Sequence, residues 1–252
     1  MSWWVTLLVG CGIGFCAGLF GLGGSSLGTP LLRLLGMPAA LALASPLPLT
    51  LFSALGGVVT FQKRGMIHWR VVGHTVFWGI PAVALGAWTT KFLPGMALML
   101  LTAMFILGIG LYGLNGLRGF LPGEGEKELH LERIPVGSVL LGFFNGLLAN
   151  GGGLVLVPFY QLVVGLDLRG ALASSLASVA LLAVPAILVH SSLGHIAWDI
   201  TFWLALGVFP CTVLGGRLAL RLSTPLLTRL YGGFLVAMAL YFGIREISQS
   251  SV

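Results

Sequence analysis

Charged residues divide this chain into long uncharged runs. Stretches without Asp, Glu, Lys or Arg cover 1–32, 34–62, 71–90, 92–117, 134–166, 170–198, 200–216 and 230–244. Most of them exceed the roughly 18 apolar residues that indicate a helix crossing a bilayer. The pattern predicts an all-α polytopic membrane protein.

The uncharged runs form two similar halves. Residues 14–30 return 128 positions later as 142–158, with matching glycines and a matching proline. The register then slips by one residue, and the loop at 65–69 returns 129 positions later at 194–198. We therefore expect a first membrane repeat at 1–115, a cytoplasmic linker at 116–133 and a second membrane repeat at 134–252.

The first run of each half is too long for one straight transmembrane helix. At 1.5 Å per residue, a helix of about 33 residues would extend about 50 Å, against a hydrocarbon core of about 30 Å. Both runs contain glycines near their centre, at 21–24 and at 151–153. We expect each run to break there as a re-entrant segment, which leaves three transmembrane helices per half.

The cations favour inverted halves. With three crossings per half, one side of the membrane would hold ten cations and the other only three, and the side richer in Lys and Arg is normally cytoplasmic. This arrangement predicts an inverted-topology repeat with both termini outside. The ten are Lys63, Arg64, Arg70, Arg118, Lys127, Arg133, Arg169, Arg217, Arg221 and Arg229, and the three are Arg33, Lys91 and Arg245.

The composition limits the classes of function and the partners that we expect for this chain. Only 8% of residues are charged, and the net charge of +6 comes from cations between the uncharged runs, so we expect a lipid bilayer and no nucleic acid as partner. No constellation of a nucleophile and base or of metal ligands is visible, so we expect no enzyme, no cofactor and no metal. The sequence predicts no particular oligomeric state.

The breaks are the candidate binding sites. Irregular backbone inside a bilayer occurs where it is buried in protein or lines a wet cavity, and a helix that restarts there presents free N–H groups that suit an anion. A second pair of breaks follows at 44–48 and 173–175. The predicted substrate-binding residues are Gly23, Gly24, Ser25, Ser26, Ser45, Pro46, Asn150, Gly151, Gly152, Gly153, Ser174 and Ser175.

Other residues in the runs have plainer interpretations. The spacing of Gly10, Gly14 and Gly18 is typical of closely packed membrane helices. The histidines inside the runs, His74 and His190, lie near run ends, and we expect both at the membrane interface rather than in a proton relay.

The glycine motif at 18–24 leading to Pro30, the Ala44-Ser45 step, the loop at 65–69 and their second-half copies resemble the TauE/SafE sulfite exporter family. This family is also called the toluene sulfonate uptake permease family. The resemblance covers about 14–93 and 142–222. Ser25 replaces the third glycine of the motif in the first copy, and Asn150 precedes it in the second.

The resemblance implies a secondary transporter in the cytoplasmic membrane of a prokaryote. Its substrate would be a small sulfur-containing anion such as sulfite, thiosulfate or an organosulfonate. We expect export by alternating access around a midplane site at the broken helices. An anion-selective channel that uses the same helix-terminus site is the alternative.

Overall fold

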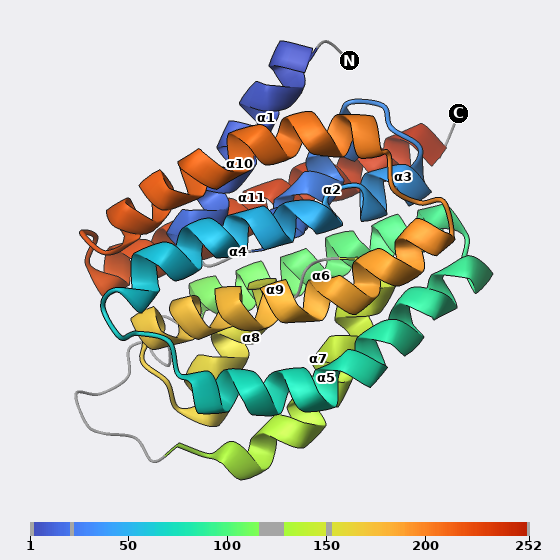
Figure 1. Cartoon of the computed structure of the whole chain (residues 1–252). Helices are drawn as coiled ribbons and strands as arrows, with labels where there is room; N and C mark the ends of the chain where they lie inside the picture. The colour runs from blue at the N-terminus through green and yellow to red at the C-terminus, as the bar shows by residue number, and fades with distance from the viewer. Residues whose placement is uncertain (1–2, 21–22, 116–128, 150–152, 251–252) are drawn as a thin grey trace.

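The computed structural model describes residues 3–20, 23–115, 129–149 and 153–250, and these residues form helices and no strand (Figure 1). The first half contains α1 (Trp3–Phe20), α2 (Gly24–Leu34), α3 (Ala39–Ala44), α4 (Leu47–Gln62), α5 (Trp69–Thr89), the 3-10 turn η1 (Thr90–Phe92) and α6 (Gly95–Asn115). The second half contains the 3-10 turn η3 (Leu131–Arg133), α7 (Ile134–Leu147), α8 (Gly153–Phe159), the π-helical turn η4 (Tyr160–Val164), α9 (Leu168–Ser192), α10 (Trp198–Ala219) and α11 (Thr224–Ser250).

Five helical segments are long and apolar enough to cross a bilayer. They are Trp3–Phe20, Ala39–Gln62, Trp69–Phe92, Leu168–Ser192 and Trp198–Ala219. The prediction of an all-helical membrane protein is confirmed. One detail differs from expectation, because α1, the first arm of the predicted re-entrant segment, is itself long enough to span.

Long helices surround the two short helices that follow the breaks. In Figure 1, α10, α4, α9 and α5 lie side by side as one layer, with α1 packed on α10, α7 packed on α5 and α6 packed on α11. Inside, α2 contacts α1, α3, α4 and α11, while α8 contacts α6, α7 and α9. Every residue from Gly24 to Pro30 is buried, so the first turn of α2 lies in the protein interior.

Helix contacts in one half have counterparts in the other. The helix α1 packs on α10, and its second-half copy α7 packs on α5, the copy of α10. Likewise α4 contacts α10 as α9 contacts α5, and the two copies meet directly in the α4–α9 and α6–α11 pairs. Each half therefore completes the helix packing of the other.

Glycines permit the closest of these contacts. A Cβ atom at Gly14 or Gly18 would collide with the backbone of Val208 or Thr212 on α10. In the other half, a Cβ atom at Gly146 would collide in the same way with the backbone of Val83 on α5. The sequence-based assignment of the α1 glycines to close helix packing is confirmed.

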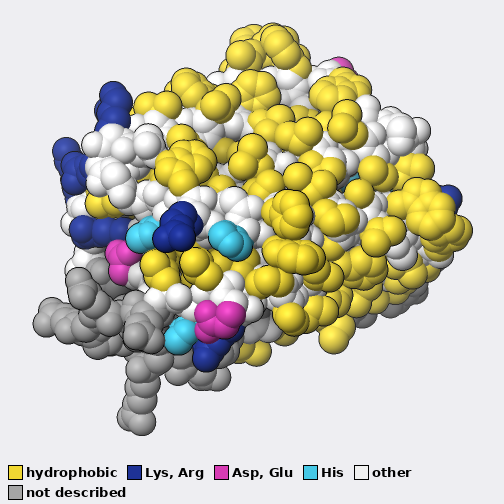
Figure 2. Space-filling view, turned by 60° about the horizontal axis from the view of Figure 1, so that its bottom comes forward, with side chains coloured by type: hydrophobic (Ala, Val, Ile, Leu, Met, Phe, Trp, Pro, Cys, Tyr) yellow, Lys and Arg dark blue, Asp and Glu magenta, His cyan; other side chains and the backbone are white. Residues whose placement is uncertain are grey.

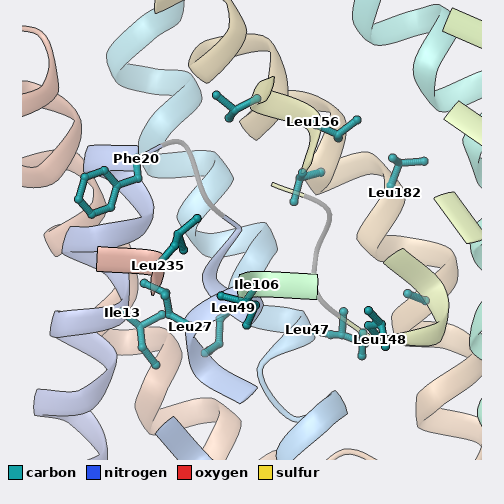
Figure 3. Close-up of a cluster of buried hydrophobic side chains, with 14 of the residues drawn as sticks. Ile13, Phe20, Leu27, Leu47, Leu49, Ile106, Leu148, Leu156, Leu182 and Leu235 are labelled. Atoms are coloured by element: carbon teal, nitrogen blue, oxygen red, sulfur yellow. The ribbon is translucent and has the colours of Figure 1, made fainter. Parts of the chain in front are cut away.

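The core consists of aliphatic side chains between the long and short helices. Figure 3 shows Ile13 and Leu27 near Leu235, so α1, α2 and α11 meet in one cluster. It also shows Leu47 near Leu148, which brings the start of α4 to the end of α7. Residues around both breaks therefore belong to one continuous core.

The two ends of the bundle differ in charge. We call the end that carries the α4–α5 loop the basic end, because Lys and Arg gather there while hydrophobic side chains cover most of the remaining visible surface (Figure 2). The loops before α9 and α7 lie at this end too, since Gly170 contacts His68 and the backbone N–H of His130 bonds to the carbonyl of Val164. The opposite end carries the loop before α10.

Candidate functional site

A chain of buried hydroxyls joins the first turn of α2 to α4. The backbone N–H of Gly24 donates to Ser53 Oγ at 3.2 Å, and that hydroxyl donates to the carbonyl of Thr50 at 3.0 Å. Thr50 Oγ1 donates to Ser25 Oγ at 3.1 Å. Ser25, Thr50 and Ser53 are each 0% exposed. We call these three side chains and the N–H of Gly24 the hydroxyl cluster.

The second break of the first half packs directly on α2. A Cβ atom at Gly28 would collide with the ring of Pro46, and Thr29 Oγ1 donates to the carbonyl of Leu43 at 3.2 Å. Two of the predicted breaks are thus in contact in the first repeat. Gly23 precedes α2 in an extended conformation, and Ser26 is buried in the first turn of the helix.

Ser45 and Ser174 have equivalent positions and an equivalent structural partner. Ser45 Oγ accepts the backbone N–H of Ala197 at 2.9 Å, and Ser174 Oγ accepts the backbone N–H of His68 at 2.9 Å. Ala197 and His68 immediately precede α10 and α5, so each serine fixes the start of a helix in the opposite half. Direct anion binding by these serines stays a prediction.

Only part of the second-half copy of the first break lies among the described residues. Asn150, Gly151 and Gly152 lie outside the described residues. Gly153 is the first residue of α8, and Ser175 is buried in α9 beside Ser174. The predicted break at 173–175 is wrong, because α9 runs unbroken from Leu168 to Ser192, and the prolines at 46 and 48 have no counterpart there. The predicted role of all five positions stays a prediction.

A second set of buried hydroxyls, which sequence reasoning missed, joins α5 of the first half to η4 and α9 of the second. Tyr160 Oη donates to Thr75 Oγ1 at 2.9 Å and lies 2.7 Å from Ser178 Oγ, and all three residues are 0% exposed. Tyr160 opens the π-helical turn η4, and such turns are frequent at functional sites. The repeat-related positions hold Leu32, Leu204 and Leu49. A search for positions that are polar in one half and apolar in the other would have identified this group.

Asn145, Gln161 and Ser138 are buried without a protein hydrogen bond. Their exposed fractions are 4%, 5% and 1%, and no described residue pairs with either amide atom of Asn145 or Gln161 or with the Ser138 hydroxyl. An unpaired buried polar group costs about 1–3 kcal/mol, so these side chains require an explanation. The repeat-related positions of the two amides hold Ala17 and Arg33, respectively.

The two histidines of the uncharged runs differ in burial. His74 is exposed and His190 is 0% exposed, and the location of both at the membrane interface stays a prediction. His190 Nε2 lies 3.3 Å from the carbonyl of Gly146, and Nδ1 lies 3.3 Å from Nδ1 of His195. Because a carbonyl only accepts, we assign the proton to Nε2, so that Nδ1 accepts from His195. Partial burial lowers the pKa of His195, in the loop before α10.

Charge is excluded from the interior around these groups. No Asp, Glu, Lys or Arg is among the buried residues of the described chain. The same part of the chain brings no three His, Cys, Asp or Glu side chains together in a metal-binding arrangement. Hydroxyls, amides and backbone N–H groups are therefore the donors that an anion would meet there.

Comparisons with known proteins identify a protein family and similar membrane proteins. The family model described as Sulfite exporter TauE/SafE matches residues 6–242. A probable membrane transporter protein of Xylella fastidiosa (strain Temecula1) is 28% identical over 244 residues, which cover 94% of this chain and 93% of the relative. The probable membrane transporter protein YjnA of Bacillus subtilis is 25% identical over 86% of this chain and 90% of its own length. No solved structure matches.

Proposed function

Because this chain belongs to the TauE/SafE sulfite exporter family, and thus to membrane transporters rather than enzymes, we propose that it exports a small sulfur-containing anion. The proposed substrates are sulfite, thiosulfate or an organosulfonate. The proposed mechanism is alternating access around the broken helices. The proposed location is the cytoplasmic membrane of a prokaryote.

The hydroxyl cluster is the observation that carries this proposal. It lies at the N-terminus of α2, where the helix dipole favours negative charge, and near the middle of the Ala39–Gln62 span. Donors around it are neutral, which suits a carrier that must release its anion after each cycle. The predicted residues Gly23, Gly24, Ser25 and Ser26 belong to this site in our proposal, with Thr50 and Ser53 added.

We propose further that the repeats at 1–115 and 134–252 are inverted and joined by a cytoplasmic linker at 116–133. The equivalent bonds of Ser45 with Ala197 and of Ser174 with His68 lie at opposite ends of the bundle, which supports this arrangement. So does the gathering of cations at one end of the bundle, which the positive-inside rule places in the cytoplasm (Figure 2). Both termini are then outside.

Export needs no coupling ion in this scheme. At about 2.3 kcal/mol per charge per 100 mV, a dianion that leaves a cell held near 150 mV releases about 7 kcal/mol. Buried carboxylates, the usual signs of proton coupling, are absent among the described residues. The anion's own charge is the proposed driving force.

Reconstitution tests the function. Purified protein in liposomes would receive radiolabelled sulfite, thiosulfate or taurine under an imposed potential that is positive inside, with protein-free liposomes as the control. We expect saturable, potential-driven uptake of at least one anion and counterflow when vesicles are preloaded with the unlabelled anion. Uptake without counterflow would identify a channel instead. No uptake of any sulfur-containing anion would refute the proposal.

A further inference from the structure

The buried amide of Asn145 is the strongest sign of a ligand outside the hydroxyl cluster. Its residue is 4% exposed, and neither its carbonyl oxygen nor its amide nitrogen has a hydrogen-bond partner in the described chain. Serine and asparagine side chains in a helix can bond to a backbone carbonyl one turn back, but the amide of Asn145 makes no such bond. Asn145 therefore needs a partner that the described residues do not supply.

The position of Asn145 on α7 directs this amide inward. Gly137 faces the ring of Phe159 at the end of α8, and Gly146 faces the backbone of Val83 on α5. At 100° per residue, Asn145 lies about midway between these two directions, on the side opposite the exposed Val136. That side is closed by α9, which contacts both α5 and α8 (Figure 1).

Asn145 lies away from the basic end. The carbonyl of the next residue, Gly146, lies 3.3 Å from Nε2 of His190, and His190 is two residues from the last residue of α9. The hydroxyl cluster, by contrast, lies halfway along the Ala39–Gln62 span. An anion moving from the hydroxyl cluster toward the opposite end of the bundle would thus pass at the level of Asn145.

The two repeats supply their polar groups at different positions. Asn145 replaces Ala17 of the first repeat, whereas Ser25, Thr50 and Ser53 are replaced by Gly153, Val179 and Leu182 in the second. Unlike Ser45 and Ser174, these four residues therefore have no polar side chain at the equivalent position of the other half.

We propose that Asn145 binds the transported oxyanion through its amide N–H groups at a second station, between the hydroxyl cluster and the end of the bundle opposite the basic end. This proposal rests on the proposed function. Two N–H donors and no positive charge give the same neutral, reversible recognition as the hydroxyls. In the inverted arrangement this station lies on the exit side of the path.

Variants of similar size separate ligand binding from packing. Asn145→Leu removes a buried amide that lacks a protein partner, so we expect a higher melting temperature without anion. The same variant should lose the anion-induced rise in melting temperature and weaken apparent transport affinity about 10- to 150-fold, the range for a hydrogen bond to a charged group. Asn145→Asp should weaken it further, because a carboxylate repels the anion.

Gln161 offers a matched control. It is a second buried amide without a protein partner, but it lies in η4 near the basic end, where the His130 N–H bonds to the carbonyl of Val164. Gln161→Leu should also raise the melting temperature without anion, yet keep the anion response and the transport affinity of the unmodified protein.

Sulfite, thiosulfate and taurine are the anions tested in both experiments, which measure the melting temperature of the purified protein and transport into liposomes. If the unmodified protein responds to none of them, the proposed function fails. If it responds and Asn145→Leu keeps the same affinity and the same thermal response, only the role of Asn145 fails. A water molecule is then the missing partner of the amide.

Discussion

At the residue scale, the candidate site is a set of small hydroxyl side chains joined by hydrogen bonds. Ser25 was predicted because it follows doubled glycines in a repeated motif. Thr50 and Ser53 were not, because a single hydroxyl in an apolar helix equally often bonds to its own backbone, as Thr102 does with the carbonyl of Leu98. Only the packing of α2 on α4 distinguishes the two cases.

Ser25→Ala should weaken apparent anion affinity by roughly 3- to 150-fold, since one hydrogen bond to a charged ligand contributes about 0.5–3 kcal/mol. Thr50→Val should have a similar effect, because Thr50 Oγ1 donates to Ser25 Oγ. The double variant should be less than additive. Transport titrations in liposomes measure this, with Thr89→Ala as the control, because Thr89 bonds only to its own helix at the carbonyl of Leu85. Full affinity in both single variants would exclude the cluster as the site.

At the element scale, the sequence predicted the helices well, but its predicted break at 173–175 is wrong, because α9 runs unbroken from Leu168 to Ser192. It also did not predict the partners of the other breaks. Long uncharged runs define α4, α5, α9 and α10, because burial in lipid leaves few other compositions. The contact of Ser45 with the loop before α10 spans 152 residues, and no local pattern carries such information. The burial of His190 was missed for the same reason, since its partner Gly146 comes from another helix.

Ser45→Ala and Ser174→Ala should each destabilise the protein. Each removes the acceptor of a backbone N–H at the start of a helix in the opposite half, and leaving such a group unpaired costs about 1–3 kcal/mol. The two sites lie at opposite ends of the bundle, so their effects should add. Thermal unfolding in detergent measures both, with Ser192→Ala as the control because Ser192 is exposed and bonds only within its own helix. Unchanged melting in either variant would show that water replaces the serine there.

At the scale of the whole molecule, the repeat and its cations predict the orientation in the membrane. The reciprocal helix pairs show that an exchange of the halves leaves the pattern of contacts unchanged, but the orientation in the membrane stays a prediction. What sequence could not predict is how closely the halves interlock. That depends on glycines meeting backbone across halves, as Gly18 meets Thr212.

Cysteine labelling tests the orientation. In a chain without its native cysteines, Glu132→Cys at the basic end should be protected from an impermeant thiol reagent in intact cells. Leu35→Cys, in the loop after α2 and 45% exposed, should react. Both should react in permeabilised cells, which controls for accessibility. The reverse pattern in intact cells would invert the proposed topology.

The pairing of α1 with α10 also has a consequence for biosynthesis. The glycine face of α1 is complete once Phe20 is made, but its partner helix begins only at Trp198, after more than half of the chain has followed. At about 5–20 residues per second, the ribosome needs roughly 10–40 s to reach that point. During this interval lipid alone can cover the face that α10 later occupies. The newly synthesised first half must therefore remain in the bilayer as loosely packed helices. The transporter acquires its final packing only when synthesis is nearly finished.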